Sequence, residues 1–538
     1  MDTFFARAYG NGRPGKDEAK SHFISKAAQA AVKDLKQIGS FRKTVGKELF
    51  YILREPSGAV VPLDKRSIEL ATLIQRRFNI NASSADIYNA LVSAFQVEAF
   101  QYGEEVEVYQ FSHVNVNTKT LYVSCLDEDN VLKVTETGVQ RVKNGEDGVF
   151  FRDPENWQAW KFVPDKYEKG IANQLLVADV NFVTTEALTK EDQALLFEMW
   201  IMSLFIDSEV KPLLAIIGES ESGKTTMLEC VKTAFAGKMG KAETISKEDA
   251  FKAAVAAEPL FLFDNLDESD MQWLSEALCA ASTGAWFTLR ALYVNNKKYS
   301  VPPRAYIAMT STNTDFSQSK PTVANRSLIL EIAPHDLNRD SVSHRAFILS
   351  KRNEILTDLV MQFPAYIMAW KAEKEVPRTR FRMAPFELLT RRFHPEKVEA
   401  LFEKLTNAQT KVEAENNPIF LALDRFFAIN PTENEVSCTA DDMRVRVETA
   451  TGQTKWTSIG IGKKIKQHKR SLTKKYNMSQ KQVKGVETYF FQRPVIGKKE
   501  GDKGERQTVH PPVGELNLKC DENAIPPSPP TPSHQGVV

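Results

Sequence analysis

The sequence predicts an α/β core with a parallel sheet, preceded by an α+β domain and followed by a helical segment and a small basic domain. Between residues 181 and 337, short and fully apolar strands alternate with helical segments, which is typical of a parallel sheet covered on both faces. A glycine-rich loop follows the first of these strands and precedes a helix. The length of 538 residues requires several domains at roughly 150 residues each.

Residues 1–180 are expected to form the N-terminal α+β domain. Residue periodicity and turn signals predict a helix over 16–38, a β-hairpin after it, and further helices over 65–78 and 84–100. Short strands separated by Asn-, Asp- and Gly-rich turns follow. No chemistry of its own is recognisable in this region.

Residues 338–415 show helical periodicity throughout and are predicted to form a helical lid behind the sheet. Residues 416–496 begin with an apolar helix and end with a strand, which favours a winged-helix-like domain. The proline-rich residues 497–538 contain few apolar side chains and are predicted to be a disordered tail.

Composition and charge exclude several classes of protein. Lys plus Arg (70) nearly equals Asp plus Glu (69), so a globally basic coat for nucleic acid is excluded. The longest apolar stretch, 194–206, contains Glu198 and is too short for a membrane helix. Five widely spaced cysteines favour reduced thiols over a disulfide framework. Because the first residues lack an apolar secretion signal, a cytoplasmic location is expected.

The motif G-x-x-x-x-G-K-T lies between an apolar strand and a helix, and it predicts a phosphate-binding loop (P-loop) for ATP. Backbone N–H groups of the loop can surround a phosphate, and the next helix presents its positive end to it. Lys224 is expected to bind the β- and γ-phosphates, and the Thr225 hydroxyl to bind Mg²⁺. The predicted nucleotide-binding residues are Gly218, Glu219, Ser220, Glu221, Ser222, Gly223, Lys224, Thr225 and Thr226.

Polar residues at the ends of later apolar segments complete the predicted catalytic set of Lys224, Asp264, Asn313 and Arg326. Asp264 is placed to bind the hydration shell of Mg²⁺, and the amide of Asn313 to orient a water molecule. In a ring, Arg326 can reach the γ-phosphate of a neighbouring subunit. Asn265 stands where ring ATPases usually have a glutamate, so Asp267 or Glu268 is the catalytic base, or hydrolysis is slow.

The run from Phe263 to Ile332, which includes the segments DNLDE, TSTN and VANR, resembles the ATPase domain of superfamily 3 and primase–helicase proteins of phages, plasmids and mobile elements. The resemblance covers roughly 190–410 and implies an AAA+-like core, hexameric rings and ATP-driven DNA unwinding. It also implies that a hairpin before the Asn strand grips DNA in the ring channel. In this chain the hairpin would be formed by TLRALYVNNKKYSVPP, with Lys297 and Lys298 contacting phosphates. A convincing primase site is absent.

A basic stretch from Lys463 to Lys484 contains nine Lys and Arg residues and no Asp or Glu. It is predicted to form the recognition helix and wing of the winged-helix-like domain. The DNA-binding candidates here are Lys469, Arg470, Lys474 and Lys475. A charged surface helix or a protein-binding face is the alternative interpretation.

Together these motifs predict an ATP- and Mg²⁺-dependent DNA helicase or translocase that acts as a ring in replication of a phage or mobile element. A nucleotide-switched DNA-binding or initiator ATPase with slow hydrolysis, in replication or defence, is the alternative that Asn265 favours. An RNA-directed ATPase also remains open, because phosphate contacts do not distinguish the two sugars.

Overall fold

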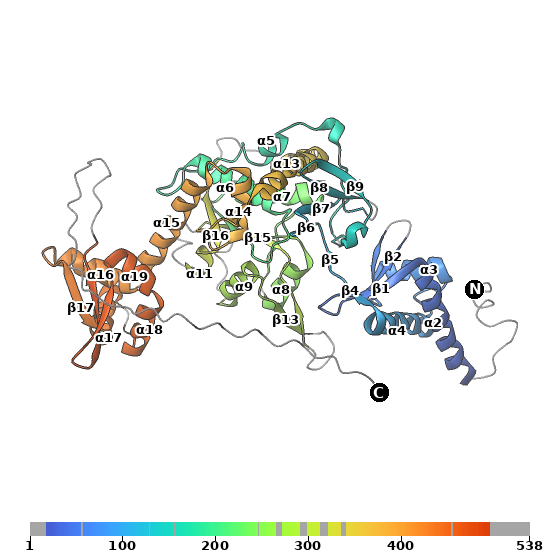
Figure 1. The fold of residues 1–538 in the computed structure, drawn as a ribbon, viewed down its shortest axis with the longest axis horizontal. Helices are drawn as coiled ribbons and strands as arrows, with labels where there is room; N and C mark the ends of the chain where they lie inside the picture. Colours follow the sequence, from blue (N-terminus) through green and yellow to red (C-terminus); the bar gives the residue numbers. More distant parts are fainter. Residues whose placement is uncertain are drawn as a thin grey trace, which may run out of the picture.

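The computed structural model describes most of the chain, and Figure 1 shows an α/β core with one smaller group of elements on either side. The described residues are 18–54, 58–127, 130–154, 156–245, 247–264, 272–290, 298–312, 321–334, 340–416, 418–452, 454 and 456–494. The tail predicted over 497–538 lies outside them. No helix within the described ranges is both long and apolar enough to cross a membrane.

The N-terminal group contains helices packed on a small mixed sheet of strand order β3-β2-β1-β4. Ser67 caps α3 by accepting a hydrogen bond from the backbone N–H of Leu70, and Asn79 ends that helix in the left-handed conformation. Buried apolar side chains between Ala28 and Ala99 form one cluster. The elements are α2 (Glu18–Ile38), β1 (Gly39–Lys43), β2 (Leu49–Leu53), β3 (Val60–Pro62), α3 (Ile68–Phe78), α4 (Ala85–Tyr102) and β4 (Glu104–Glu105).

A four-stranded parallel sheet of order β12-β15-β11-β16 forms the centre of the core, so the predicted α/β core is confirmed. A separate antiparallel pair, β13 and β14, extends from it. The elements are β11 (Leu213–Ile217), α7 (Lys224–Ala236), α8 (Glu248–Ala257), β12 (Leu260–Phe263), α9 (Gln272–Ser282), β13 (Phe287–Arg290), β14 (Lys298–Val301), β15 (Tyr306–Ser311), α11 (Pro321–Ala324) and β16 (Ser327–Glu331).

Alternate residues of β11 point to opposite faces of the sheet, and both faces are covered. Leu214 and Ile216 belong to the apolar cluster that includes α7, whereas Leu213 and Ile217 belong to the cluster that includes α8 and α9. Every residue of β11 is buried. This double burial explains why the strand is apolar throughout instead of alternating.

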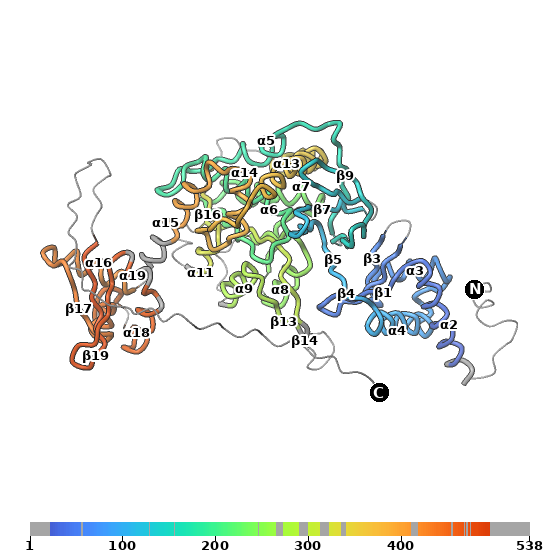
Figure 2. The backbone as a smooth tube through the Cα atoms, viewed as in Figure 1, coloured from blue at the N-terminus to red at the C-terminus, as the bar shows by residue number. Residues whose placement is uncertain are grey.

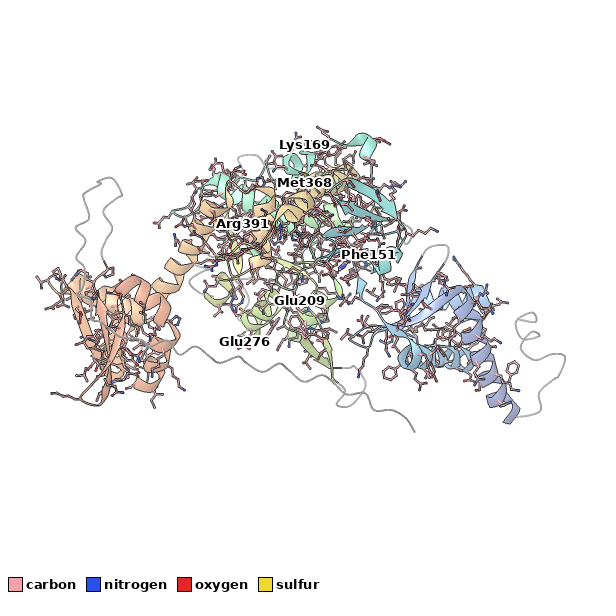
Figure 3. The ribbon with its side chains drawn as sticks, in the orientation of Figure 1. Phe151, Lys169, Glu209, Glu276, Met368 and Arg391 are labelled. Carbon is pink, nitrogen blue, oxygen red and sulfur yellow. The ribbon has the colours of Figure 1, made fainter. Side chains whose placement is uncertain are left out.

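The helical region after the sheet packs into the same apolar cluster as α7. Figure 3 shows Met368 and Arg391 of this region on one side of the core and Glu276 of α9 on the other. The elements are α12 (Ser341–Ser350), α13 (Arg352–Ala372), α14 (Ala384–Phe393) and α15 (Val398–Asn416).

Many buried residues from Phe111 to Phe182 pack with the core, whereas Phe150 packs against Phe50, Ile52 and Val60 of the N-terminal sheet. Strands of this region form an antiparallel sheet of order β6-β7-β8-β9, and Figure 2 shows them beside α13. The helix that contacts β8 and β9, α13, comes from far along the chain. The elements are β5 (Val108–Tyr109), β6 (Ser112–Asn115), β7 (Thr120–Ser124), β8 (Val131–Thr135), β9 (Gly138–Val142), β10 (Phe150–Phe151), α5 (Ile171–Leu176) and α6 (Lys190–Ser203), with 3-10 turns at Glu146–Gly148 and Pro164–Lys166.

Residues 158–172 form a segment, called the strap here, and polar side chains at the start of α13 hold it through hydrogen bonds. Asn353 and Thr357 accept hydrogen bonds from backbone N–H groups of the strap at 2.9 and 3.0 Å, and the Asp358 carboxylate accepts two more at 3.0 and 3.1 Å. The buried Arg352 guanidinium donates to carbonyl oxygens of the strap and of the last turn of α7. One helix thus joins the strap to α7.

The C-terminal group follows α15 and combines helices with a three-stranded antiparallel sheet of order β17-β19-β18. Its apolar residues form a cluster of their own. Thr439 and Asp442 form a capping box that starts α17. The elements are α16 (Pro418–Ile429), β17 (Glu435–Thr439), α17 (Ala440–Thr451), α18 (Ser458–Gln467), α19 (Lys469–Tyr476), β18 (Ser479–Val483) and β19 (Val486–Gln492).

Candidate nucleotide-binding site

The glycine-rich loop connects the buried strand β11 directly to α7, which begins at Lys224. A Cβ atom at Gly218 would lie 2.4 Å from the carbonyl oxygen of Ile332, so no side chain fits there. Gly223 has a φ of 84°, a conformation that favours glycine. The loop therefore turns tightly and leads into the positive end of the α7 dipole, an arrangement that favours an anion.

Lys224 begins α7 directly after the loop, and only 8% of it is exposed. Its Nζ donates to the carbonyl oxygens of Gly218 and Glu219 at 2.7 and 2.5 Å and to Ser222 Oγ at 3.3 Å. These acceptors hold the ammonium group beside the loop backbone. From this position it can exchange carbonyl oxygens for phosphate oxygens.

The carboxylate of Asp264 accepts hydrogen bonds from two hydroxyl groups, one on the first turn of α7 and one on the neighbouring strand β15. Oδ1 of Asp264 accepts from Thr225 Oγ1 at 2.8 Å and from Thr310 Oγ1 at 2.7 Å. Asp264 follows β12 and Thr310 lies near the end of β15, so the carboxyl ends of the parallel strands bring them together. Nothing in the sequence singles out Thr310 as the partner of Asp264, because the two are 46 positions apart.

Thr225 and Asp264 offer the hydroxyl and carboxylate oxygens that suit Mg²⁺. Across the described part of the chain, no group of three or more His, Cys, Asp or Glu residues is arranged to hold a metal ion. A Mg²⁺ ion at Thr225 and Asp264 would therefore share its remaining positions with phosphate oxygens and water.

A cavity of about 360 Å³ adjoins the loop and the first turn of α7. Apolar residues that follow the strap form part of its wall, and His344 of α12 contributes from a distant part of the sequence. An apolar wall with a few polar groups is suited to a base and sugar. The lining residues are Leu175, Leu176, Asp179, Val180, Asn181, Glu221, Ser222, Gly223, Lys224, Thr225, Thr226, Met227, Cys230, Ile332 and His344.

Arg326 lies at the N-terminal end of the parallel strands, whereas the loop follows their C-terminal end. It directly precedes β16, whose first residue, Ser327, pairs in parallel register with Leu213 at the start of β11. The loop follows the other end of β11, so the length of that strand, roughly 16 Å, separates the two. An arginine side chain is too short to cover this distance, so Arg326 does not reach the nucleotide site of its own chain.

The sequence profile of a family described as AAA domain matches residues 203–484, which is more than half of the chain. The chain belongs to the AAA domain family. The matched region of this AAA protein includes the loop, Asp264, Thr310 and Arg326. No curated protein matches the sequence.

Solved structures with some similarity to this AAA protein include proteins described as helicases. A structure titled "SCCmec type IV Cch - active helicase" has 12% identity over 84% of this chain and 92% of its own, with a TM-score of 0.42. The NrS-1 C-terminal region has 11% identity, covers 86% and 98%, and has a TM-score of 0.37. JCV helicase has 14% identity, covers 45% and 64%, and has a TM-score of 0.23.

Several predicted residues of the AAA protein lie outside the described part of the chain: Asn265, Asp267, Glu268, Lys297 and Asn313. Lys298 begins β14, and β13 and β14 pair as an antiparallel hairpin on either side of the undescribed residues. The structure therefore shows the two paired strands at the base of the hairpin that the sequence predicts.

The basic candidates of the C-terminal group all lie on α19. Lys469 is exposed at the start of this helix. Lys475 has a different environment, because its Nζ forms an ion pair of 2.8 Å with Asp424 of α16. Tyr476 donates to the same carboxylate at 2.8 Å, and burial raises the pKa of its hydroxyl, with the hydrogen bond to Asp424 adding to the effect. Lys475 thus ties α19 to α16.

Proposed function

We propose that this AAA protein is an ATP- and Mg²⁺-dependent, ring-forming DNA helicase or translocase of superfamily 3 type. In this proposal it acts in the replication of a phage or mobile element and works as a hexamer. The observation that carries the proposal is the separation of Arg326 from the loop of its own chain. Arg326 can therefore complete a nucleotide site only from a neighbouring copy.

The residues around the loop have defined roles in this proposal. Lys224 would bind the β- and γ-phosphates, and the N–H groups at the start of α7 would stabilise their charge. Thr225 and Asp264 would hold Mg²⁺, which when bound neutralises charge that develops on the phosphates. Thr310 would hold the Asp264 carboxylate in place, and Asn313 would orient the attacking water.

DNA contacts would come from two basic elements. Lys297 and Lys298 would contact DNA from the hairpin whose base β13 and β14 form. The order of helices and strands in the C-terminal group supports a winged-helix-like domain, in which Lys469, Arg470 and Lys474 would contact phosphates. We leave Lys475 out of this set, because its ammonium group is paired with Asp424.

An ATPase assay with and without single-stranded DNA, together with unwinding of a forked duplex, tests the proposal. We expect DNA to stimulate hydrolysis, and both Lys224→Ala and Arg326→Ala to abolish it. In mixed assemblies the two variants should complement each other, since each chain supplies what the other lacks. A protein that stays monomeric with ATP analogue and DNA, or that hydrolyses ATP without stimulation and without unwinding, would contradict the proposal.

The second candidate is a nucleotide-switched DNA-binding or initiator ATPase, and Asn265 after Asp264 favours it. Without a glutamate at that position, slow hydrolysis would let bound ATP set the oligomeric state. This alternative predicts ATP-driven assembly that Lys224→Ala abolishes, with turnover below about 0.1 s⁻¹, well under ordinary enzyme rates. Light scattering with ATP alone, followed by a turnover measurement, separates the two candidates.

A further inference from the structure

The N-terminal group carries a basic run that lies outside the ATPase core. Residues 19–47 contain seven Lys and Arg and one acidic residue, Asp34. That carboxylate is already neutralised, because it forms an ion pair of 2.7 Å with Arg77 of α3. In a chain with a formal net charge of +1, this local excess of positive charge favours an anionic partner.

Three lysines of this run share one side of α2, called the lysine face here. Lys26, Lys33 and Lys36 are all exposed, and their spacings of seven and three residues place them on the same side of the helix. Lys36 forms an ion pair of 2.5 Å with Glu98 of α4, whereas Lys26 and Lys33 form none with any described residue. From Lys26 to Lys36 the lysine face extends about 15 Å. A row of this length can contact several phosphates of one strand.

Two exposed aromatic side chains lie where the lysine face ends. α4 packs beside α2 (Figure 1), and its last turn carries Phe100, which is 52% exposed, and Tyr102, which is 73% exposed. The Lys36 ammonium lies 5.9 Å from the centre of the Tyr102 ring. The last lysine of the row is therefore next to an exposed ring.

Lys43 on β1 joins the other ring to the basic run. Its ammonium donates to the carbonyl oxygen of Phe100 at 3.0 Å and lies 5.9 Å from the centre of that ring. This hydrogen bond offsets the partial negative charge at the end of α4, which would otherwise repel a phosphate. Among the acids that follow α4, Glu104 forms an ion pair with Arg42, and Glu105 is exposed. Around the rings, cations thus outnumber unpaired carboxylates of the described residues.

We propose that the lysine face, together with Lys43, Phe100 and Tyr102, is a binding surface for single-stranded nucleic acid. Ammonium groups would contact the phosphates, and unpaired bases would stack on the two rings. The bases of a duplex are stacked on one another, so a duplex would use the cations and not the rings. Lysines and rings do not read the sugar, so DNA and RNA strands share the required chemistry. The inference goes beyond the proposed function, because this surface lies outside the ATPase core and needs no ATP.

Photocrosslinking of the full chain without ATP tests where the bases lie. The protein would be irradiated with a DNA strand that contains iododeoxyuridine and, in a parallel arm, with an RNA strand that contains iodouridine, and the adducts mapped by mass spectrometry. We expect adducts on Phe100 and Tyr102. A higher yield in one arm would support the inference and identify the sugar. Adducts confined to the hairpin of β13 and β14 or to the C-terminal group would overturn it.

Fluorescence anisotropy with a labelled single strand measures what the rings contribute. The parent chain would carry Lys297→Gln and Lys298→Gln, so that binding by the hairpin does not mask a loss. We expect Tyr102→Ala to raise the Kd roughly 5- to 100-fold, because one stacked base is lost, and Tyr102→Trp to keep the affinity. If Tyr102→Ala weakened binding of a duplex as much as binding of a single strand, stacking on the ring would be refuted.

The salt dependence of binding tests the lysine face. Lys33→Gln should reduce the slope of log Kd against log salt by about 0.7, the value for one phosphate contact with a single strand. Lys65→Gln is the matched control, because this exposed lysine lies beside the start of α4, where its carbonyl oxygen accepts from Tyr88 at 3.3 Å. Thermal unfolding would establish that both variants are folded. Equal slopes in the two variants would overturn the assignment of the lysine face.

The inference and the proposed function fail in different ways. Lys224→Ala removes the ammonium group expected to bind ATP, yet it should crosslink at the rings like the wild type. ATP-driven unwinding by a wild-type protein that gives no adduct in the N-terminal group would overturn only this inference. If Phe100→Ala with Tyr102→Ala changed the oligomeric state and left strand affinity unchanged, the rings would belong to a contact between copies, which would also overturn it.

Discussion

Replacing Thr310 by valine removes one of the two hydroxyl donors to Asp264 while keeping the shape of the side chain. Thr310 is 3% exposed, and its Oγ1 donates to Asp264 Oδ1 at 2.7 Å. A hydrogen bond to a charged group is worth roughly 1.5–3 kcal/mol. When Mg²⁺ and nucleotide bind Thr225, Thr310 is the hydroxyl that still donates to the Asp264 carboxylate. Losing the Thr310 hydroxyl should therefore destabilise the metal-bound state by the whole energy of this hydrogen bond.

We therefore expect the free Mg²⁺ concentration that gives half-maximal ATP hydrolysis to rise roughly 10- to 100-fold in Thr310→Val. Thr310→Ser keeps the hydroxyl and should restore most of the affinity. Thr312→Val, at an exposed position two residues further on, is the matched control. Thermal unfolding would establish that each variant is folded. A Mg²⁺ dependence of Thr310→Val equal to that of Thr312→Val would refute the reasoning.

Three further predictions follow from local geometry. Gly218→Ala should abolish binding of a fluorescent ATP analogue, because its Cβ would lie 2.4 Å from the carbonyl oxygen of Ile332. The Cβ of Gly223→Ala meets no atom within 4 Å, so this variant should lose only the roughly 1 kcal/mol that a non-glycine residue costs in the left-handed conformation. Equal losses of binding in the two variants would contradict this prediction. Burial lowers the pKa of Lys211 to about 8, whereas the unfolded chain keeps this proton to about pH 10, so the free energy of unfolding should rise between these two pH values. Measurements of Tm against pH should show this rise in the wild type and not in Lys211→Met. Arg352→Met should lower the free energy of unfolding in urea by roughly 3 kcal/mol, because buried carbonyl oxygens lose their donors; a change below about 1 kcal/mol would count against it.

The central sheet could be predicted from the sequence because its signal is local. Every residue of β11 is buried, so its two faces are both apolar and the strand reads as one continuous apolar run. The loop after it could be predicted because its glycines, Lys224 and Thr225 stand at a fixed spacing along the chain. These features need no knowledge of distant contacts.

The parts that could not be predicted depend on contacts between distant residues. The pairing of Thr310 with Asp264 follows from strand order, which a list of apolar segments does not give. Lys475 belongs to a basic run, yet a carboxylate 51 positions away neutralises it. His344 lines the cavity beside Lys224 only because α12 folds back over α7. Charge counts and periodicity describe segments and not their partners.

The fastening of the strap and of α7 to α13 affects how this protein can be divided. A fragment that stops after β16 would keep the whole glycine-rich loop but lose Arg352 and Asp358, which bind the last turn of α7 and the strap. Domain borders drawn around the sheet alone would thus cut through polar contacts buried inside. An excised unit meant to be stable should run from before β6 to the end of α15, and swapping the sheet into a relative should include the same span.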